Sequence, residues 1–280
     1  MNCLLSPRKM LWIVCCWLVA GSGWVHGATL SNGDLTVQFH NDGSLKDVAV
    51  QGRSYFLPGD PPIGWGFHSS ETGFGKQNAN MGFSDFSTSS SGLAGSSFVW
   101  QGSNGSLSAQ ITYSLVSSST LRIVTSIRND SLSQSIDYTY FHAGDPDVGF
   151  SDSATFDTFN DVNPGMAGAT FGADWVEFRS SDPLAVFSFL EFAIDVTLQA
   201  QLDYQVGNPY DPNGSLEDFG MMIAWQKTLA PGESTVHSFD IVIPSTAVVP
   251  EPASLALWSM TLGSAGYFRR RRIPSELCCQ

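Results

Sequence analysis

Apolar and polar residues alternate along several segments in the middle of this chain. Between Leu107 and Leu115 every second residue is apolar, and the residues between them are serine, glutamine or threonine. Similar alternation recurs at 121–128 and 136–140. Because successive side chains of a β-strand point to opposite faces, such segments bury one face and expose the other. The pattern therefore predicts β-strands rather than helices.

Turn-forming residues separate these segments at short intervals. Asn41-Asp42-Gly43 lies between two apolar segments, and Ser103-Asn104-Gly105 precedes the alternating segment that begins at Leu107. Asn-Gly and Asp-Gly pairs favour the positive φ angles of tight hairpin turns. Many antiparallel strands with one apolar face each predict an all-β body, built as a β-sandwich of two packed sheets. The serine-rich and glycine-rich segment 87–97 is expected to be a long loop.

The N-terminus has the order of a secretory signal peptide. Arg8 and Lys9 precede an apolar segment at 10–20, and small residues follow it. An apolar segment this short, with positive charge before it, is typical of a signal helix that is removed after export. We expect signal peptidase to cut between Gly27 and Ala28, which leaves a body at 28–244.

The C-terminus begins with a short spacer at 245–249 and continues with Pro250-Glu251-Pro252. An uncharged segment at 253–268 follows and ends at Arg269, Arg270, Arg271 and Arg272. A helix of that length spans roughly 24 Å, and arginines that reach toward the headgroups extend it. Arginine excess marks the cytoplasmic side of a membrane. The order predicts a transmembrane helix with the body outside and a cytoplasmic tail at 273–280.

This ordered set, from Val249 to Arg272, resembles the PEP-CTERM sorting signal of Gram-negative and related bacteria. The resemblance implies that an exosortase-type membrane protease processes the chain. Pro250, Glu251 and Pro252 would then be recognition residues for that partner. The protein would reach the cell surface or the extracellular space, anchored transiently or permanently in the inner membrane by the C-terminal helix.

Charge and cysteine content exclude several classes of function. The formal net charge is −13, and six of the cations lie in the terminal segments, so the body is more acidic than the whole chain. An acidic body repels nucleic acid, which excludes it as a partner. All five cysteines also lie in the terminal segments. The body therefore relies on its own core, without disulfides or thiolate zinc sites.

Two groups of residues in the body are candidates for binding. Aromatic residues and glycines cluster between Tyr55 and Phe86, and Trp65 and Phe67 could stack on the sugar rings of an extracellular polysaccharide. The alternative is that these rings cover the edge of the core. Calcium is the one metal suggested, through four carboxylates in an acidic segment, because Ca²⁺ takes six to eight oxygen ligands. A solvated acidic loop is the alternative. These carboxylates belong to Asp145, Asp147, Asp152 and Asp157.

The beginning of the body, from Leu30-Ser31-Asn32-Gly33 to Tyr55-Phe56, resembles the first strands of galactose-mutarotase-like supersandwich domains. Epimerases of that family use a histidine and a glutamate, but no histidine of the body has a matching context, and no catalytic residue is assigned. Two hypotheses follow. The first, which we favour, is an exported surface or matrix protein without catalytic activity that has a structural, adhesive or carbohydrate-binding role. The second is a carbohydrate-active enzyme of the supersandwich type.

Overall fold

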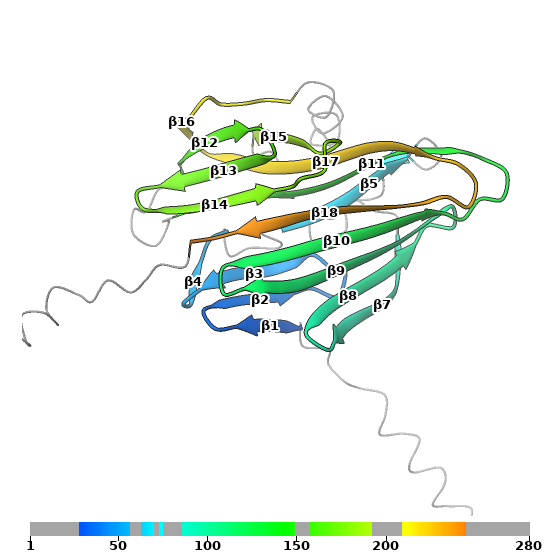
Figure 1. Ribbon diagram of the computed structural model, residues 1–280, viewed down its shortest axis with the longest axis horizontal. Coiled ribbons are helices and arrows are strands. Elements are labelled where there is room, and N and C mark those ends of the chain that lie inside the picture. Colours follow the sequence, from blue (N-terminus) through cyan, green and yellow to red (C-terminus); the bar gives the residue numbers. More distant parts are fainter. Residues whose placement is uncertain are drawn as a thin grey trace, which may run out of the picture. The chain divides into compact units, whose positions relative to one another are not determined.

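The computed structural model describes residues 28–56, 63–69, 73–74, 86–148, 157–191 and 209–244. Within these ranges the chain forms two antiparallel sheets and no helix, which confirms the all-β sandwich (Figure 1). None of the described residues belongs to a helix that could cross a membrane. The signal helix and the C-terminal helix predicted at 253–268 lie outside the described residues. The described residues all belong to one compact unit, which ends at Pro244.

The first sheet has the spatial order β1-β2-β3-β5-β11-β17-β15. Its strands are β1 (Thr29–Asn32), β2 (Leu35–Phe39), β3 (Leu45–Val50), β5 (Ile63–Ser69), β11 (Ile136–Gly144), β17 (Phe219–Leu229) and β15 (Val186–Glu191), with β4 (Arg53–Ser54) beside β3 and β6 (Gly73–Phe74) beside β5.

The second sheet has the order β16-β12-β13-β14-β18-β10-β9-β8-β7. Its strands are β16 (Ser215–Glu217), β12 (Thr158–Asn163), β13 (Met166–Phe171), β14 (Asp174–Arg179), β18 (Ser234–Val242), β10 (Thr120–Asn129), β9 (Leu107–Ser117), β8 (Ser97–Ser103) and β7 (Ser87–Ala94). The alternation predicted at 107–115 and 121–128 corresponds to β9 and β10, which pair with each other. Their buried residues alternate with exposed or half-buried ones, as a sheet with one face on the core requires.

The core lies between the two sheets and is rich in aromatic rings. Tyr140 of β11 stacks on Trp225 of β17, and Trp225 stacks on His237 of β18 at 5.0 Å between ring centroids. Polar groups within this core pair with each other. The Tyr138 hydroxyl contacts His237 Nε2 at 2.6 Å, and the Thr125 and Tyr140 hydroxyls are 2.6 Å apart. These contacts join strands of opposite sheets and satisfy groups that would otherwise be costly to bury.

The predicted hairpin turn at Asn41-Asp42-Gly43 joins β2 to β3, and side chains of both sheets hold it. Gly43 has φ = 81°, a conformation that suits glycine. Its carbonyl accepts a hydrogen bond from the Tyr113 hydroxyl at 2.5 Å, and the Asp42 carbonyl accepts one from Trp65 Nε1 at 3.0 Å. The side chain of Trp100 packs directly against Gly43. The turn is therefore part of the core rather than a free loop.

The prediction of a long loop at 87–97 is wrong, because Ser87–Ala94 forms the edge strand β7. Nearly all of its residues are exposed. An edge strand with both faces in water needs no apolar alternation, so the sequence pattern contains no strand signal there. Pairing with β8 supplies the backbone hydrogen bonds that make it a strand.

Candidate functional site

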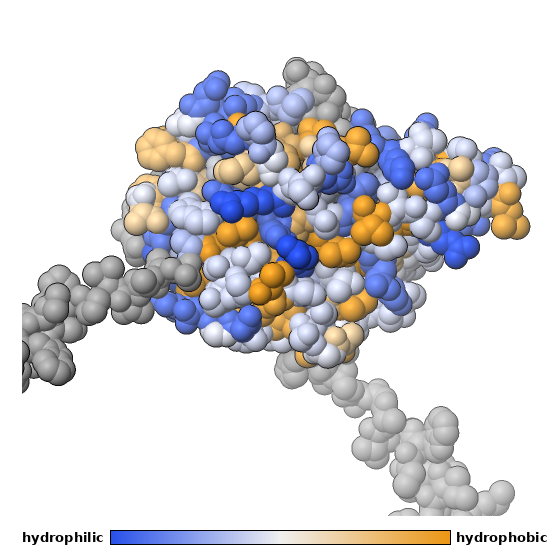
Figure 2. All heavy atoms as spheres, in the orientation of Figure 1, coloured by the Kyte–Doolittle hydropathy of each residue, from blue (hydrophilic) through white to orange (hydrophobic). Residues whose placement is uncertain are grey.

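The outward face of the second sheet carries a regular array of polar side chains. On β9, Ser108, Gln110, Thr112 and Ser114 alternate with residues of the buried core and therefore point outward. We call the outward side chains of β8, β9, β10, β18 and β14 the polar face. These strands lie in front in Figure 1, and Figure 2 shows hydrophilic side chains there with separate hydrophobic ones between them.

Residues in register on neighbouring strands form rows that cross the polar face. One row extends from β13 to β8, and a second extends from β18 to β8. The first consists of Met166, Arg179, Asp240, Arg122, Ser114 and Ser97. The second consists of Val236, Ser126, Gln110 and Gln101. Neighbouring strands lie about 4.8 Å apart, so each row presents side chains at that repeat.

Hydrogen bonds between neighbouring side chains order these rows. Gln101 Nε2 donates to Gln110 Oε1 at 2.6 Å, and the Ser97 and Ser114 hydroxyls are 2.8 Å apart. The Ser90 hydroxyl, from β7, donates to Gln101 Oε1 at 3.1 Å. Each amide or hydroxyl can make further hydrogen bonds beyond the one to its neighbour. The face thus offers pre-oriented donors and acceptors to a ligand rich in hydroxyl groups.

Three arginines extend over the polar face, and each is paired with a carboxylate. Arg122 donates from Nε and Nη2 to the two carboxylate oxygens of Asp240, at 2.8 and 2.9 Å. This pairing raises the pKa of Arg122 above its ordinary value. Arg179 pairs with Glu177, and Arg128 Nε lies 3.4 Å from Asp130. Each pair has no net charge, so this part of an acidic body is close to neutral.

Two hollows lie on the polar face. One of about 440 Å³ extends from β7 to β18 and has Gln101, Gln110, Ser126 and Arg128 among its lining residues. The other, of about 340 Å³, lies over β10, β18 and β14 and includes Arg122 and Asp240. The two outward rows described above cross these hollows. A long ligand lying along a row would occupy both the hollow and its polar rim.

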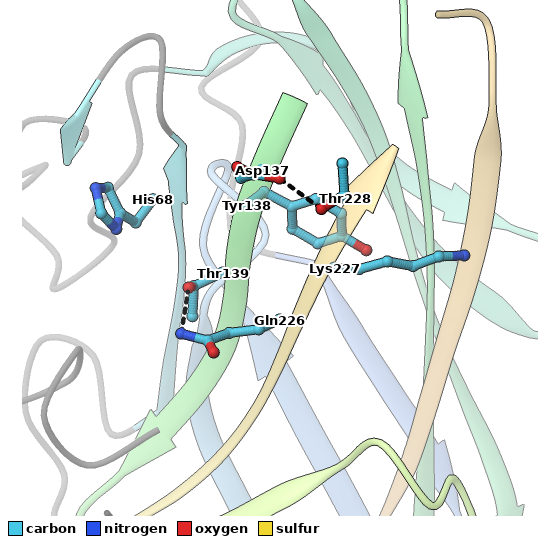
Figure 3. Close-up of a pocket in the computed structure, with 7 residues that line it drawn as sticks. All are labelled: His68, Asp137, Tyr138, Thr139, Gln226, Lys227 and Thr228. Atoms are coloured by element: carbon cyan, nitrogen blue, oxygen red, sulfur yellow. Dashed lines mark hydrogen bonds between the residues drawn. The ribbon is translucent and has the colours of Figure 1, made fainter. Parts of the chain in front are cut away.

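A third hollow, of about 510 Å³, lies at the first sheet, where β5, β11 and β17 meet. Figure 3 shows its lining: Gln226 and Thr139 lie on one side of the strands, and Lys227 extends to the other side. Gln226 Nε2 donates to the Thr139 hydroxyl at 3.3 Å, and the Thr228 hydroxyl donates to Asp137.

The outward face of this first sheet also carries a buried apolar cluster of Phe141, Leu190, Met222 and Ala224. A long ligand therefore has less open polar surface there than on the second sheet. For this reason we take the polar face as the candidate site.

Trp65 and Phe67 lie in the core. Each side chain is 2% exposed, and Trp65 contacts the rings of Phe67 and Trp100. Both residues point inward from β5, where the buried Gly66 separates them. A ring enclosed in this way has no face open to a sugar. Both rings are members of the core cluster itself.

The described carboxylates of the acidic segment differ in their exposure to solvent. Asp145 and Asp147 are buried beyond the end of β11, whereas Asp157 is exposed and Asp152 lies outside the described residues. Burial, with the nearby Asp147 and Asp218 carboxylates, raises the pKa of Asp145 to about 8. Among the described residues no group of three or more histidine, cysteine or acidic side chains is arranged to hold a metal ion. Calcium binding stays a prediction.

Two buried histidines lie in the core, and one of them is close to a carboxylate. His237 Nδ1 lies 3.5 Å from Asp182 Oδ2, but His237 is buried in the core and lines none of the hollows described above. His142 is buried as well and contacts the Tyr140 hydroxyl. Acid–base catalysis requires such a pair within reach of a substrate. His68 lines the third hollow together with Asp137, so the enzymatic hypothesis stays a prediction.

Two outward aromatic residues of the second sheet were missed in the sequence. Phe159 of β12 and Trp175 of β14 point away from the core. Both occupy outward positions of short strands, where polar residues are expected, so each large ring interrupts an otherwise polar face. That interruption is the signal that the sequence contains for them.

Comparison with known proteins confirms the sorting signal. Residues 248–272 match the family model of the PEP-CTERM protein-sorting motif. The match covers Pro250, Glu251 and Pro252, the uncharged segment and Arg269 to Arg272, all of which lie outside the described residues. The motif marks an exported protein that is sorted by exosortase, a membrane enzyme of the protease kind. A search of curated proteins found no match to this chain.

Solved structures resemble the chain only distantly. A heparinase III, the BT4657 gene product, has a TM-score of 0.45 at 8% identity, over 81% of this chain and 36% of that one. Heparan sulfate lyase HepC from Pedobacter heparinus gives 0.43 at 6% identity, over 87% and 42%. A putative kojibiose phosphorylase from the human microbiome gives 0.40 at 8%, over 85% and 33%. The chain spans less than half the length of each, and similarity this low carries no functional argument.

Proposed function

We propose that this chain is an exported bacterial surface or matrix protein whose β-sandwich binds extracellular polysaccharide on the polar face, without catalysing a reaction. The sorting motif supports export of the body, and polysaccharide is an abundant ligand outside the cytoplasm. The observation that supports the proposal is the pair of hollows crossed by in-register rows of hydroxyl, amide and guanidinium groups. Polysaccharides present hydroxyl groups at regular spacing, and such rows can pair with them.

Hydrogen bonding on this face has little conformational cost. Gln101 and Gln110 hold each other, and Arg122 is fixed by both oxygens of Asp240. Side chains that are ordered before binding lose less entropy when a ligand arrives. The hydroxyls of a bound sugar can then replace their hydrogen bonds to water with hydrogen bonds to protein side chains that are already oriented. Many such contacts along one chain would produce useful affinity without a deep pocket.

A binding experiment with matched variants tests this proposal. The exported full-length protein and the double variant Gln101→Ala/Gln110→Ala are measured by affinity electrophoresis in gels that contain exopolysaccharide isolated from the producing cells. The control is Thr139→Ala/Gln226→Ala, which removes an equivalent hydrogen-bonded pair from the outward face of the first sheet. We expect at least about a tenfold loss of affinity for the first variant and no change for the control.

Two results would overturn the proposal. The first is equal retardation of the polar-face variant and the parent protein. The second is equal loss for both double variants, which would place the ligand elsewhere or indicate a general effect on folding. Circular dichroism and urea unfolding of each variant separate these readings. Gln110 and Gln226 are exposed and Gln101 is half-buried, whereas Thr139 is buried, so the fold of the control is checked before its affinity is compared.

The sorting step is tested separately by intact-mass measurement of the cell-surface or released protein. We propose that signal peptidase cuts between Gly27 and Ala28, and that exosortase recognises Pro250, Glu251 and Pro252. A mass that begins at Ala28 and ends before the arginine cluster would support both steps. A mass that extends to Gln280 would contradict processing at the sorting motif.

A further inference from the structure

Four residues in register form a second kind of row at the other end of the second sheet. Leu216 of β16, Phe159 of β12, Thr170 of β13 and Trp175 of β14 are successive register partners. Phe159 is 48% and Leu216 46% exposed, Thr170 is exposed, and Trp175 is half-buried. The residues directly before and after Phe159 and Trp175 in their strands are buried. We call Phe159, Thr170 and Trp175 the aromatic row.

The spacing within the aromatic row is set by the sheet. Phe159 and Trp175 are two strands apart, which places their backbones about 10 Å from each other. The hydroxyl of Thr170 stands between them. An extended glycan that lies across the strands advances by about one sugar residue per strand. Three successive sugars of such a chain can then lie over Phe159, Thr170 and Trp175, in that order.

Trp175 is also connected to the polar face. The guanidinium of Arg179 lies 5.7 Å from the centroid of the Trp175 ring, and Arg179 is the register partner of Asp240 in the first polar row. A cation at this distance from an indole ring attracts it and limits its motion. The aromatic row and the polar face are therefore neighbouring parts of one surface.

The charge on this surface selects among polysaccharides. Arg122, Arg128 and Arg179 are the cations of this face, and each is paired with a carboxylate. The whole chain carries a net charge of −13. A polyanion would have to displace these carboxylates and approach a negatively charged body, whereas an uncharged glycan meets neither cost. The guanidinium groups of the arginines and the amide groups of the glutamines can still bind the hydroxyls of a neutral sugar.

We infer that the ligand is an uncharged, extended polysaccharide that crosses the strands of the second sheet and stacks sugar faces on Phe159 and Trp175. This inference rests on the proposed function and narrows it to a class of ligand, a direction and an aromatic subsite. The apolar C–H face of a pyranose suits an aromatic ring, and its hydroxyl edges suit the polar rows. A protein partner would be an alternative occupant, and the experiment below distinguishes it.

The test uses the full-length exported protein and three polysaccharide probes in affinity electrophoresis: mixed-linkage β-glucan and dextran, which are neutral, and alginate, which is acidic. The variants are Trp175→Ala and Phe159→Ala, with Leu132→Ala as the control, because Leu132 is an exposed apolar side chain in the loop between β10 and β11. We expect about a tenfold or greater loss of affinity for a neutral probe in each aromatic variant and none in the control.

Tryptophan fluorescence supplies a readout that a general loss of structure would not imitate. Among the described residues Trp65, Trp100 and Trp225 are buried, whereas Trp175 is half-buried on the surface. Protection of the emission from iodide by the neutral glycan should disappear in Trp175→Phe. This variant keeps a ring for stacking, so its affinity should remain within about threefold of the parent.

The outcomes separate this inference from the proposed function. If Gln101→Ala/Gln110→Ala weakens binding but Trp175→Ala and Phe159→Ala do not, the aromatic subsite is refuted and the proposed function stands. Tighter binding of alginate than of either neutral glycan, with strong weakening by salt, would refute the uncharged ligand. Retardation by no polysaccharide, including the cells' own, would refute both, and association with a protein in place of a glycan would do the same.

Discussion

Substitution of Gly43 by alanine is the sharpest test of how the two sheets are joined. A Cβ atom at Gly43 would lie 2.8 Å from Trp100 Cγ and 2.9 Å from Trp100 Cβ. The backbone there has φ = 81°, which costs a non-glycine residue about 1 kcal/mol. Atoms this close must move apart, and overpacking of a core typically costs about 1–3 kcal/mol more. Gly43→Ala should therefore lower the free energy of unfolding by about 2–4 kcal/mol.

Gly52 provides a matched control. It has φ = 79°, and a Cβ atom there would meet nothing within 4 Å. Gly52→Ala should cost only the backbone part, about 1 kcal/mol. Equilibrium urea unfolding of the full-length chain, followed by tryptophan fluorescence, measures both values. The excess in Gly43→Ala isolates the contact with Trp100.

A second substitution confirms the cause. In the double variant Gly43→Ala/Trp100→Ala, Trp100 Cγ and Cδ1 are removed, which relieves two of the three close contacts with the new Cβ. The cost of the alanine at position 43 should therefore fall toward that of Gly52→Ala. The coupling free energy between the two sites would then be about 1 kcal/mol or more. If Gly43→Ala and Gly52→Ala differ by less than about 0.5 kcal/mol, the turn is not clamped by the core and the reasoning fails.

Three further predictions concern ionisable groups and metal binding. Burial raises the pKa of Asp145 to about 8 in the folded state, so its contribution to stability is complete below about pH 4 and is lost as the pH rises to about 8. In urea unfolding with chelator, Asp145→Asn should reduce this loss of stability by up to about 5 kcal/mol at pH 9. An unchanged pH profile of the unfolding free energy would refute the burial effect. Burial lowers the pKa of His142 to about 3, so folding loses stability as the pH falls from about 6.5 toward 3, and His142→Gln should reduce this acid sensitivity in the same assay. If the segment that contains Asp145 and Asp147 binds calcium, millimolar calcium should raise the melting temperature over a chelator control, and coincident melts would remove the calcium hypothesis.

The sequence was sufficient for the fold class because the strands of a two-layer sandwich leave a clear pattern. Leu107, Ile111 and Tyr113 are buried on β9, and the polar residues between them are outward. The turn at Gly43 was also predicted from Asp-Gly chemistry. In contrast, β7 was missed because an exposed edge strand of serines has neither alternation nor strand propensity. Residues 87–94 form a strand because they pair with β8, and the local sequence does not predict that pairing.

The residues of the candidate site were harder to predict, because strand register determines which face of the sheet a side chain occupies. Trp65 and Phe67 have the composition of a sugar platform, yet the phase of β5 turns both rings into the core. Phe159 and Trp175 lie 16 positions apart in the chain and become neighbours only because β13 pairs with both β12 and β14. Likewise the Arg122 and Asp240 pair joins residues from distant segments. A single sequence shows each of these residues, but it does not show that they lie on the same face of the sheet.

The distribution of charge gives the two parts of the chain compatible roles. An acidic body keeps exported copies apart and soluble while the C-terminal segment is recognised, because like charges repel at the distances of close approach. The same charge would repel acidic polymers from every surface. On the polar face, however, the pairs Arg122–Asp240 and Arg179–Glu177 cancel the local charge, while the arginine side chains stay half exposed. Such a face can hold an uncharged, hydroxyl-rich chain and still discriminate against a charged one, and loss of Asp240 alone should convert the preference toward acidic glycans by leaving Arg122 free to bind them.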